Sequence, residues 1–224
     1  MAETSKLTAK DGTEVPGALS EAPGGKASGA VILVHEWWGL NGHIRGVADR
    51  LAQEGFTVFA VDLFQGKVAK DPATAQQYMN ALDWKQAEVA LLRAAEALRQ
   101  RQPGTKVGIT GFCLGGALAL FGAAKDPGLA ACVPFYGIPG DDKADVTKIR
   151  APVLGHFANQ DDFCSPDRVN ALEAKLKGTN VPAELHRYDA QHAFFNDTRP
   201  EVYSPQNAGT AWRRTVDFLH AKLG

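Results

Sequence analysis

The sequence is poor in cysteine and has no long apolar run. Cys113, Cys132 and Cys164 are spread over 224 residues without a CxxC pair, which argues against a disulfide framework or a zinc cluster and favours a reducing cytoplasm. No run approaches the roughly 18 apolar residues that span a bilayer. The segment Met1–Lys6 lacks the apolar stretch of a secretory signal, so we do not expect it to act as one.

Excess charge of one sign is also absent. The formal net charge is −1 and no Lys/Arg-rich block occurs, which argues against nucleic acid or an anionic membrane as a partner. The composition, 45% hydrophobic and 22% charged, is that of an ordinary globular protein. The length suits one domain, 1–224, with a core that needs neither disulfides nor a structural metal.

Short apolar runs alternate with helical patterns along most of the chain, after a hairpin in residues 5–20 that turns at Asp11-Gly12. This alternation predicts an α/β fold with a mostly parallel central sheet and helices on both faces. The expected strands are 31–35, 56–61, 106–110, 130–135, 152–156 and an edge-like 183–188. Helical periodicity covers 44–51, 84–98, 169–176 and 212–223. Another helix is expected within 66–83, where a lid over the sheet's C-terminal edge would sit.

The segment Gly111–Gly116, GFCLGG, lies between a predicted strand and an Ala-rich helix. This is the G-x-nucleophile-x-G turn of α/β-hydrolases, with Cys113 in the place of the usual serine. Glycines are needed because side chains two positions before and after the nucleophile would collide with the neighbouring strand and helix. The start of the helix would favour a thiolate. The plainer interpretation is a buried structural cysteine beside helix-packing glycines.

A nucleophile needs a base, and the base needs an orienting acid, each on a loop after a later strand. Strand 152–156 leads to Asp161 and Asp162, either of which can orient the base. Strand 183–188 leads to His192, the candidate base, although a histidine on a surface loop is common. His156, His186 and His220 are expected to be ordinary packing or surface residues.

The loop after strand 31–35 supplies further candidates. Trp37 and Leu114 are expected to donate backbone N–H groups to an oxyanion hole. Glu36 can accept the thiol proton, hold the thiol neutral until substrate arrives, or be a solvated loop residue. His35-Glu36 begins like HExxH, but position 39 is glycine, so no metal is expected. Some aromatic residues of the active-edge loops are expected to line an apolar pocket, although aromatic residues on loops are often plain packing. The candidate substrate-binding residues are Trp38, Phe112, Phe194 and Asn196.

With these residues assembled, the chain resembles the dienelactone hydrolase family from about Val31 to the C-terminus. The matching motifs are His35–Asn41, Val61–Phe64, Gly111–Gly116, Gln160–Phe163 and Gln191–Phe194. The resemblance implies an α/β-hydrolase fold and a Cys113–Asp161–His192 triad, with Glu36 matching a glutamate that interacts with the resting thiol. Members hydrolyse dienelactone, a cyclic unsaturated ester, to maleylacetate.

Well-known members also bind the substrate carboxylate with two arginines. The position four residues after the histidine is Asn196 here, and residues 71–78 contain no arginine. This pair of carboxylate-binding arginines is missing unless Lys67, Lys70 or Arg199 replaces it.

The residues therefore predict a hydrolase that cleaves a lactone or carboxylic ester by Cys-His-Asp catalysis, without cofactor or metal. We expect a small-molecule substrate and a monomer or weak homodimer. One alternative is a carboxylesterase or thioesterase for neutral, apolar esters. Another is a non-catalytic redox sensor in which Cys113 is oxidised and an exposed Cys164 resolves it.

Overall fold

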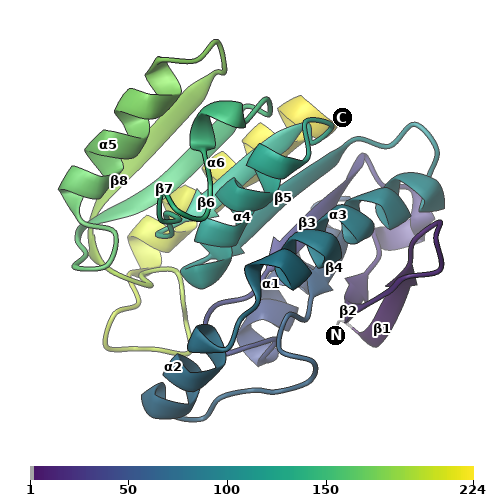
Figure 1. The fold of residues 1–224 in the computed structure, drawn as a ribbon, viewed down its shortest axis with the longest axis horizontal. Coiled ribbons are helices and arrows are strands. Elements are labelled where there is room, and N and C mark those ends of the chain that lie inside the picture. Colours follow the sequence, from purple (N-terminus) through teal and green to yellow (C-terminus); the bar gives the residue numbers. More distant parts are fainter. Residues whose placement is uncertain (1–2) are drawn as a thin grey trace.

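The computed structural model describes residues 3–224, which form an eight-stranded sheet in the order β1-β2-β4-β3-β5-β6-β7-β8 (Figure 1). The strands are β1 (Glu3–Thr8), β2 (Glu14–Ser20), β3 (Gly29–Val34), β4 (Phe56–Val61), β5 (Val107–Phe112), β6 (Ala131–Phe135), β7 (Val153–Gln160) and β8 (Ala183–Gln191). The helices are α1 (Gly42–Gln53), α2 (Pro72–Asn80), α3 (Trp84–Arg101), α4 (Leu114–Lys125), α5 (Pro166–Lys177) and α6 (Pro205–Leu223). Met1 and Ala2, which begin the segment considered as a secretory signal, lie outside this description.

The sheet confirms the predicted α/β-hydrolase topology. Strands β3 to β8 pair with one another in parallel, while β2 pairs antiparallel with both β1 and β4. The expected hairpin places Leu7 opposite Val15, and Gly12 takes a positive φ of 85° in its turn. Every residue of β3 and β5 is buried, as expected for strands covered on both faces.

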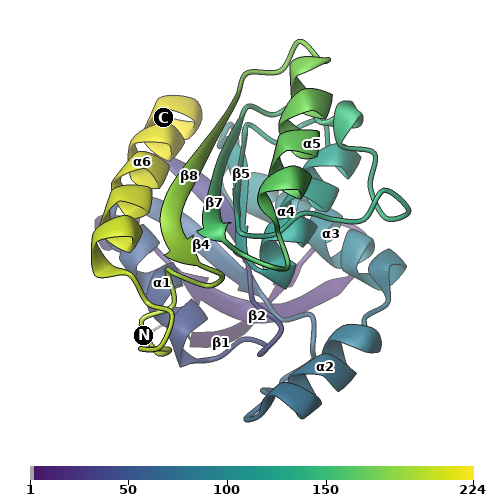
Figure 2. The same ribbon diagram turned by 90° about the vertical axis from the view of Figure 1, so that its left-hand side faces the viewer.

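Helices cover both faces of the sheet, as predicted (Figure 2). One core lies under α1 and α6 and contains Ile44, Leu51 and Leu219. The other lies under α3, α4 and α5 and contains Leu91, Leu118 and Leu172. No helix in residues 3–224 is both long and apolar enough to cross a membrane.

Two strands run further than the apolar pattern predicts. Strand β7 continues to Gln160 and β8 to Gln191, beyond the expected ends at 156 and 188. Beyond residue 156, β7 still pairs with β8, Ala158 with Tyr188 and Gln160 with Gln191. The paired strands therefore extend past the last buried residue of β7. The extension carries the loops after β7 and β8 to the same sheet edge as the end of β5.

The helix expected within 66–83 is α2, which begins after the capping side chain of Asp71. Its residue Tyr78 packs against Phe64, which follows β4. Histidines predicted to have packing or surface roles behave accordingly. His156 is fully buried and bonds Tyr188 and Thr215, while His220 is exposed.

Candidate active site

Cys113 lies in a strained turn between β5 and α4. Its backbone has φ 54° and ψ −116°, a conformation that L-residues rarely adopt. A Cβ on Gly111 would lie 2.3 Å from the carbonyl oxygen of Gly115, and one on Gly115 would lie 2.2 Å from that of Val34. Both positions therefore require glycine, as the nucleophile turn predicted.

Three side chains from three loops form a hydrogen-bonded line. The Sγ of Cys113 lies 3.1 Å from Nε2 of His192, and Nδ1 of His192 lies 2.7 Å from Oδ2 of Asp161. Because an ionised carboxylate only accepts, Nδ1 carries the ring proton and Nε2 is left to accept from the thiol. The loops meet because they follow β5, β7 and β8, whose C-terminal ends share one sheet edge.

Asp161, rather than its neighbour Asp162, contacts the imidazole of His192. Asp161 is buried and its Oδ1 accepts from the N–H groups of Phe163 and Cys164, both at 2.8 Å. Burial raises the pKa of Asp161, but the hydrogen bond and charge of His192 and these N–H groups outweigh it and leave the pKa lowered. Asp162 is exposed.

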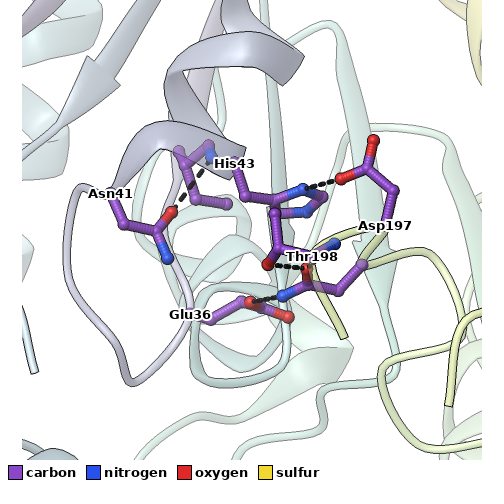
Figure 3. A network of polar contacts seen from close by, with 7 residues as sticks. Glu36, Asn41, His43, Asp197 and Thr198 are labelled. Carbon is purple, nitrogen blue, oxygen red and sulfur yellow. Dashed lines mark hydrogen bonds and ion pairs between the residues drawn. The ribbon is translucent and has the colours of Figure 1, made fainter. Parts of the chain in front are cut away.

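Glu36 is buried rather than solvated, with 1% of its surface exposed. Its Oε2 accepts a 2.6 Å hydrogen bond from the side-chain amide of Asn196. Thr198 donates to Oδ1 of Asn196 through its N–H and its hydroxyl, and His43 contacts Asp197 at 2.9 Å, which ties the same loop to α1 (Figure 3). Burial raises the pKa of Glu36 and is only partly offset by the nearby His43 and Asn196.

His35, the last residue before Glu36, fixes the peptide bond between Glu36 and Trp37. The N–H of Leu63 donates to Nε2 of His35 at 3.1 Å, so Nε2 is an acceptor and Nδ1 carries the proton. Nδ1 lies 2.6 Å from the carbonyl oxygen of Glu36 and donates to it. Since C=O and N–H point in opposite directions across a trans peptide, this bond also orients the N–H of Trp37.

Leu114, the other predicted oxyanion donor, is the first residue of α4. The N–H groups of a helix's first turn have no intrahelical partner. The N–H of Leu114 lies close enough to the sulfur of Cys113 to oppose the rise in its pKa. Of the two expected donors, the N–H of Leu114 therefore lies beside the sulfur.

The resting thiol of Cys113 is protonated. Burial and then the negative charge of Glu36 raise its pKa far above the ordinary value. This outweighs the expected preference of the α4 N-terminus for a thiolate. Because Cys113 is half-buried rather than sealed off, its sulfur remains reachable.

The prediction that Cys164 is exposed is wrong. Only 3% of Cys164 is exposed, since it packs in the core beneath α5. Burial raises the pKa of its thiol to about 12. A thiol with so little thiolate is a poor resolving partner, which removes the support for the redox-sensing alternative.

Two aromatic residues expected to line a pocket lie in the core instead. Phe112 and Phe194 are 1% and 0% exposed, and Phe112 stacks on Phe195 with ring centroids 5.1 Å apart. They support the site from beneath. Trp38 is half-buried and packs edge-on against Trp37 at 5.1 Å, while the fourth candidate, Asn196, contacts Glu36.

Two residues beside His192 were not predicted. The ring of Phe163 lies 5.0 Å from that of His192 and is 66% exposed, so it is available to contact a substrate. The ring of Tyr136 lies 5.1 Å from His192 and is fully buried. The available signal was position, because Tyr136 follows strand β6 at the edge where β5 ends.

The cations considered as substitutes for the missing arginines differ in their placement. The guanidinium of Arg199 lies 6.0 Å from the Trp38 ring, and its Nε bonds Glu201 at 2.8 Å. It is near enough for its charge to lower the pKa of Glu36. Lys67 lies over Tyr78 at 5.9 Å, and Lys70 is exposed.

Comparison with known proteins agrees with this architecture. The dienelactone hydrolase family model matches residues 17–223. Protein usf of Aquifex pyrophilus is 37% identical over 96% of both chains, and a protein provisionally named carboxymethylenebutenolidase from Aquifex aeolicus is 34% identical over 96% of both. A provisionally named dienelactone hydrolase from Klebsiella pneumoniae has a TM-score of 0.86 at 29% identity, covering 99% of this chain and 98% of its own. The chain belongs to the dienelactone hydrolase family.

Proposed function

We propose that this protein hydrolyses a carboxylic ester or lactone with Cys113 as nucleophile, His192 as base and Asp161 as the orienting acid. The observation that carries the proposal is the continuous contact from sulfur to imidazole to carboxylate, 3.1 Å and 2.7 Å. These separations suit proton transfer and orientation in a nucleophile–base–acid arrangement.

In this mechanism His192 takes the thiol proton through Nε2 as the sulfur attacks the substrate carbonyl. The N–H groups of Trp37 and Leu114 hold the oxyanion, and the alkoxide leaves with the proton from His192. His192 then activates water to release the acid from the thioester. Glu36 keeps the thiol protonated between turnovers, since its charge disfavours a thiolate.

We propose that the preferred substrate is an ester whose acyl group is neutral and apolar. Asn196 occupies the position where family members carry a carboxylate-binding arginine, and its amide is committed to Glu36. The exposed ring of Phe163 and the half-buried Trp38 offer apolar surface beside the sulfur. Arg199, paired with Glu201, is the cation that would favour the anionic alternative.

A matched pair of substrates tests this proposal: a lactone that bears a carboxylate, and a neutral cyclic ester with the same ring that lacks it. We expect a higher kcat/KM for the neutral ester in the wild type, and neither substrate hydrolysed by Cys113→Ala. A strong preference for the anionic lactone would contradict the substrate assignment. Failure to hydrolyse any member of a wider ester and lactone panel would contradict the function itself.

A further inference from the structure

Tyr136 has a strained and tightly determined position beside the candidate triad. It follows β6, with φ 34°, and is one of four non-glycine residues with positive φ in the described chain. A Cβ on the next residue, Gly137, would lie 2.0 Å from the carbonyl oxygen of Cys113. The N–H of Cys113 donates to the carbonyl of Phe135 at 3.0 Å. The backbone on both sides of Tyr136 is therefore packed directly on the nucleophile turn.

The phenol hydroxyl is buried without a close hydrogen-bond partner. Tyr136 is 0% exposed, and its hydroxyl makes no hydrogen bond of acceptable geometry within residues 3–224. Buried polar groups are nearly always paired, because an unpaired one destabilises the fold. A phenylalanine would pack against the rings of His192, Phe112 and Phe194 equally well. The strain and the unpaired hydroxyl together indicate a role other than packing.

The groups around the hydroxyl favour it as a donor to an anion. Burial raises the pKa of Tyr136, the negative charges of Glu36 and Cys113 and a weak contact of the hydroxyl with the Glu36 carboxylate add to the rise, and the charge of Arg199 only partly opposes them. The phenol therefore keeps its proton at neutral pH. Glu36, which also accepts from Asn196, is at most a weak resting partner of the hydroxyl, whereas the sulfur of Cys113 becomes a charged acceptor when its proton moves to His192.

We propose that Tyr136 is a further catalytic residue whose hydroxyl donates a hydrogen bond to the sulfur of Cys113 when the thiol proton passes to Nε2 of His192. No bond to Tyr136 forms or breaks, and its own proton stays on the phenol oxygen. The inference rests on the proposed function, in which Cys113 is the nucleophile. The other charged or titratable groups near the sulfur are Glu36, Asp161 and Cys164; the first two are carboxylates, and the thiol of Cys164 is only a weak donor.

The test is the pH profile of Cys113 alkylation by iodoacetamide in Tyr136→Phe, followed on the peptide that contains Cys113. We expect the thiol pKa to rise and alkylation at neutral pH to slow about tenfold or more, the effect of losing a hydrogen bond to a charged group. The melting temperature should stay level or rise, since an unpaired hydroxyl is removed. Tyr188→Phe is the matched control, because its hydroxyl bonds His156 and Arg214 away from the sulfur. That control should lose stability and keep the wild-type alkylation profile.

Coincident alkylation profiles for Tyr136→Phe and the wild type would overturn the inference, even if ester turnover fell, because the hydroxyl would then act elsewhere. Alkylation requires no substrate. Its result is therefore distinct from failure of the proposed function, which would appear as turnover that survives Cys113→Ala.

Discussion

The side-chain amide of Asn196 donates a 2.6 Å hydrogen bond to the Glu36 carboxylate, although the two residues are 160 positions apart in the chain. Both are 1% exposed. An amide has no charge with which to balance a buried carboxylate, so the pKa of Glu36 remains raised by burial. Thr198 and the His43–Asp197 contact fix Asn196 in turn. Glu36 is thus held in one orientation by the fold itself.

Asn196→Ala is expected to lower the free energy of unfolding by about 1.5–3 kcal/mol, since it leaves a buried charged acceptor without its donor. Urea unfolding at neutral pH measures this change. Asn207→Ala is the matched control, because Asn207 donates only to neutral oxygens of Asp189 and Ser204. Equal losses of unfolding free energy in the two variants would show that the hydrogen bond to Glu36 stabilises the fold no more than one to a neutral oxygen.

Glu36→Gln should change how stability depends on pH. A carboxyl whose pKa is raised in the folded state gives its full stability below its unfolded pKa of about 4.3 and loses it as pH rises through the folded value. Glutamine does not titrate, and its oxygen still accepts from Asn196. We expect the variant to gain stability relative to the wild type as pH rises from about 4.5 to 8. A difference in free energy of unfolding between Glu36→Gln and the wild type that stays constant over this pH range would contradict the raised pKa of Glu36.

Asp161→Asn and Asp162→Asn separate the two adjacent carboxylates. The oxygen of an asparagine at 161 should stay with the N–H groups of Phe163 and Cys164, so its NH2 group would face His192 and favour the wrong tautomer; we expect kcat to fall by at least about a hundredfold. Asp162 is exposed, so its variant should keep wild-type kcat. Steady-state ester hydrolysis measures both, and a comparable loss in the two variants would argue against Asp161 as the orienting acid.

His35→Ala tests whether His35 orients the N–H of Trp37. Losing its bond to the Glu36 carbonyl should lower kcat about tenfold or more, up to the hundred- to thousand-fold loss that follows complete removal of an oxyanion donor. KM should change little, because the ground-state carbonyl gains less from this N–H. His35→Gln can still accept from Leu63 and donate to Glu36, so we expect it to restore much of kcat. Lack of any rescue would indicate that the imidazole acts only as packing.

Features carried by local pattern were predictable from the sequence. Continuous apolar runs marked the parallel strands, and Gly111–Gly116 marked the turn that presents Cys113. The order of loops along parallel strands also brought His192 to the correct edge. Residue spacing alone left Asp161 and Asp162 open, because only the structure shows which carboxylate is buried against the imidazole.

Features that depend on side-chain direction were not predictable. Phe112 ends β5 and Phe194 lies on the loop after β8, as lining residues would, yet both are buried in the core. Cys164 stands beside exposed Asp162 and Phe163, yet the N–H bond to Asp161 turns it inward. Tyr136 was missed because its unpaired hydroxyl and strained backbone leave no mark on composition or periodicity.

The central claim is that Cys113 is the nucleophile, and the most direct test is kcat/KM for p-nitrophenyl acetate in Cys113→Ala beside Cys132→Ala. Cys132 is a fully buried free cysteine in β6, so its variant controls for the loss of a core thiol. We predict that Cys113→Ala hydrolyses the ester no faster than the uncatalysed reaction, while folded Cys132→Ala remains active. Wild-type turnover by folded Cys113→Ala would contradict the account.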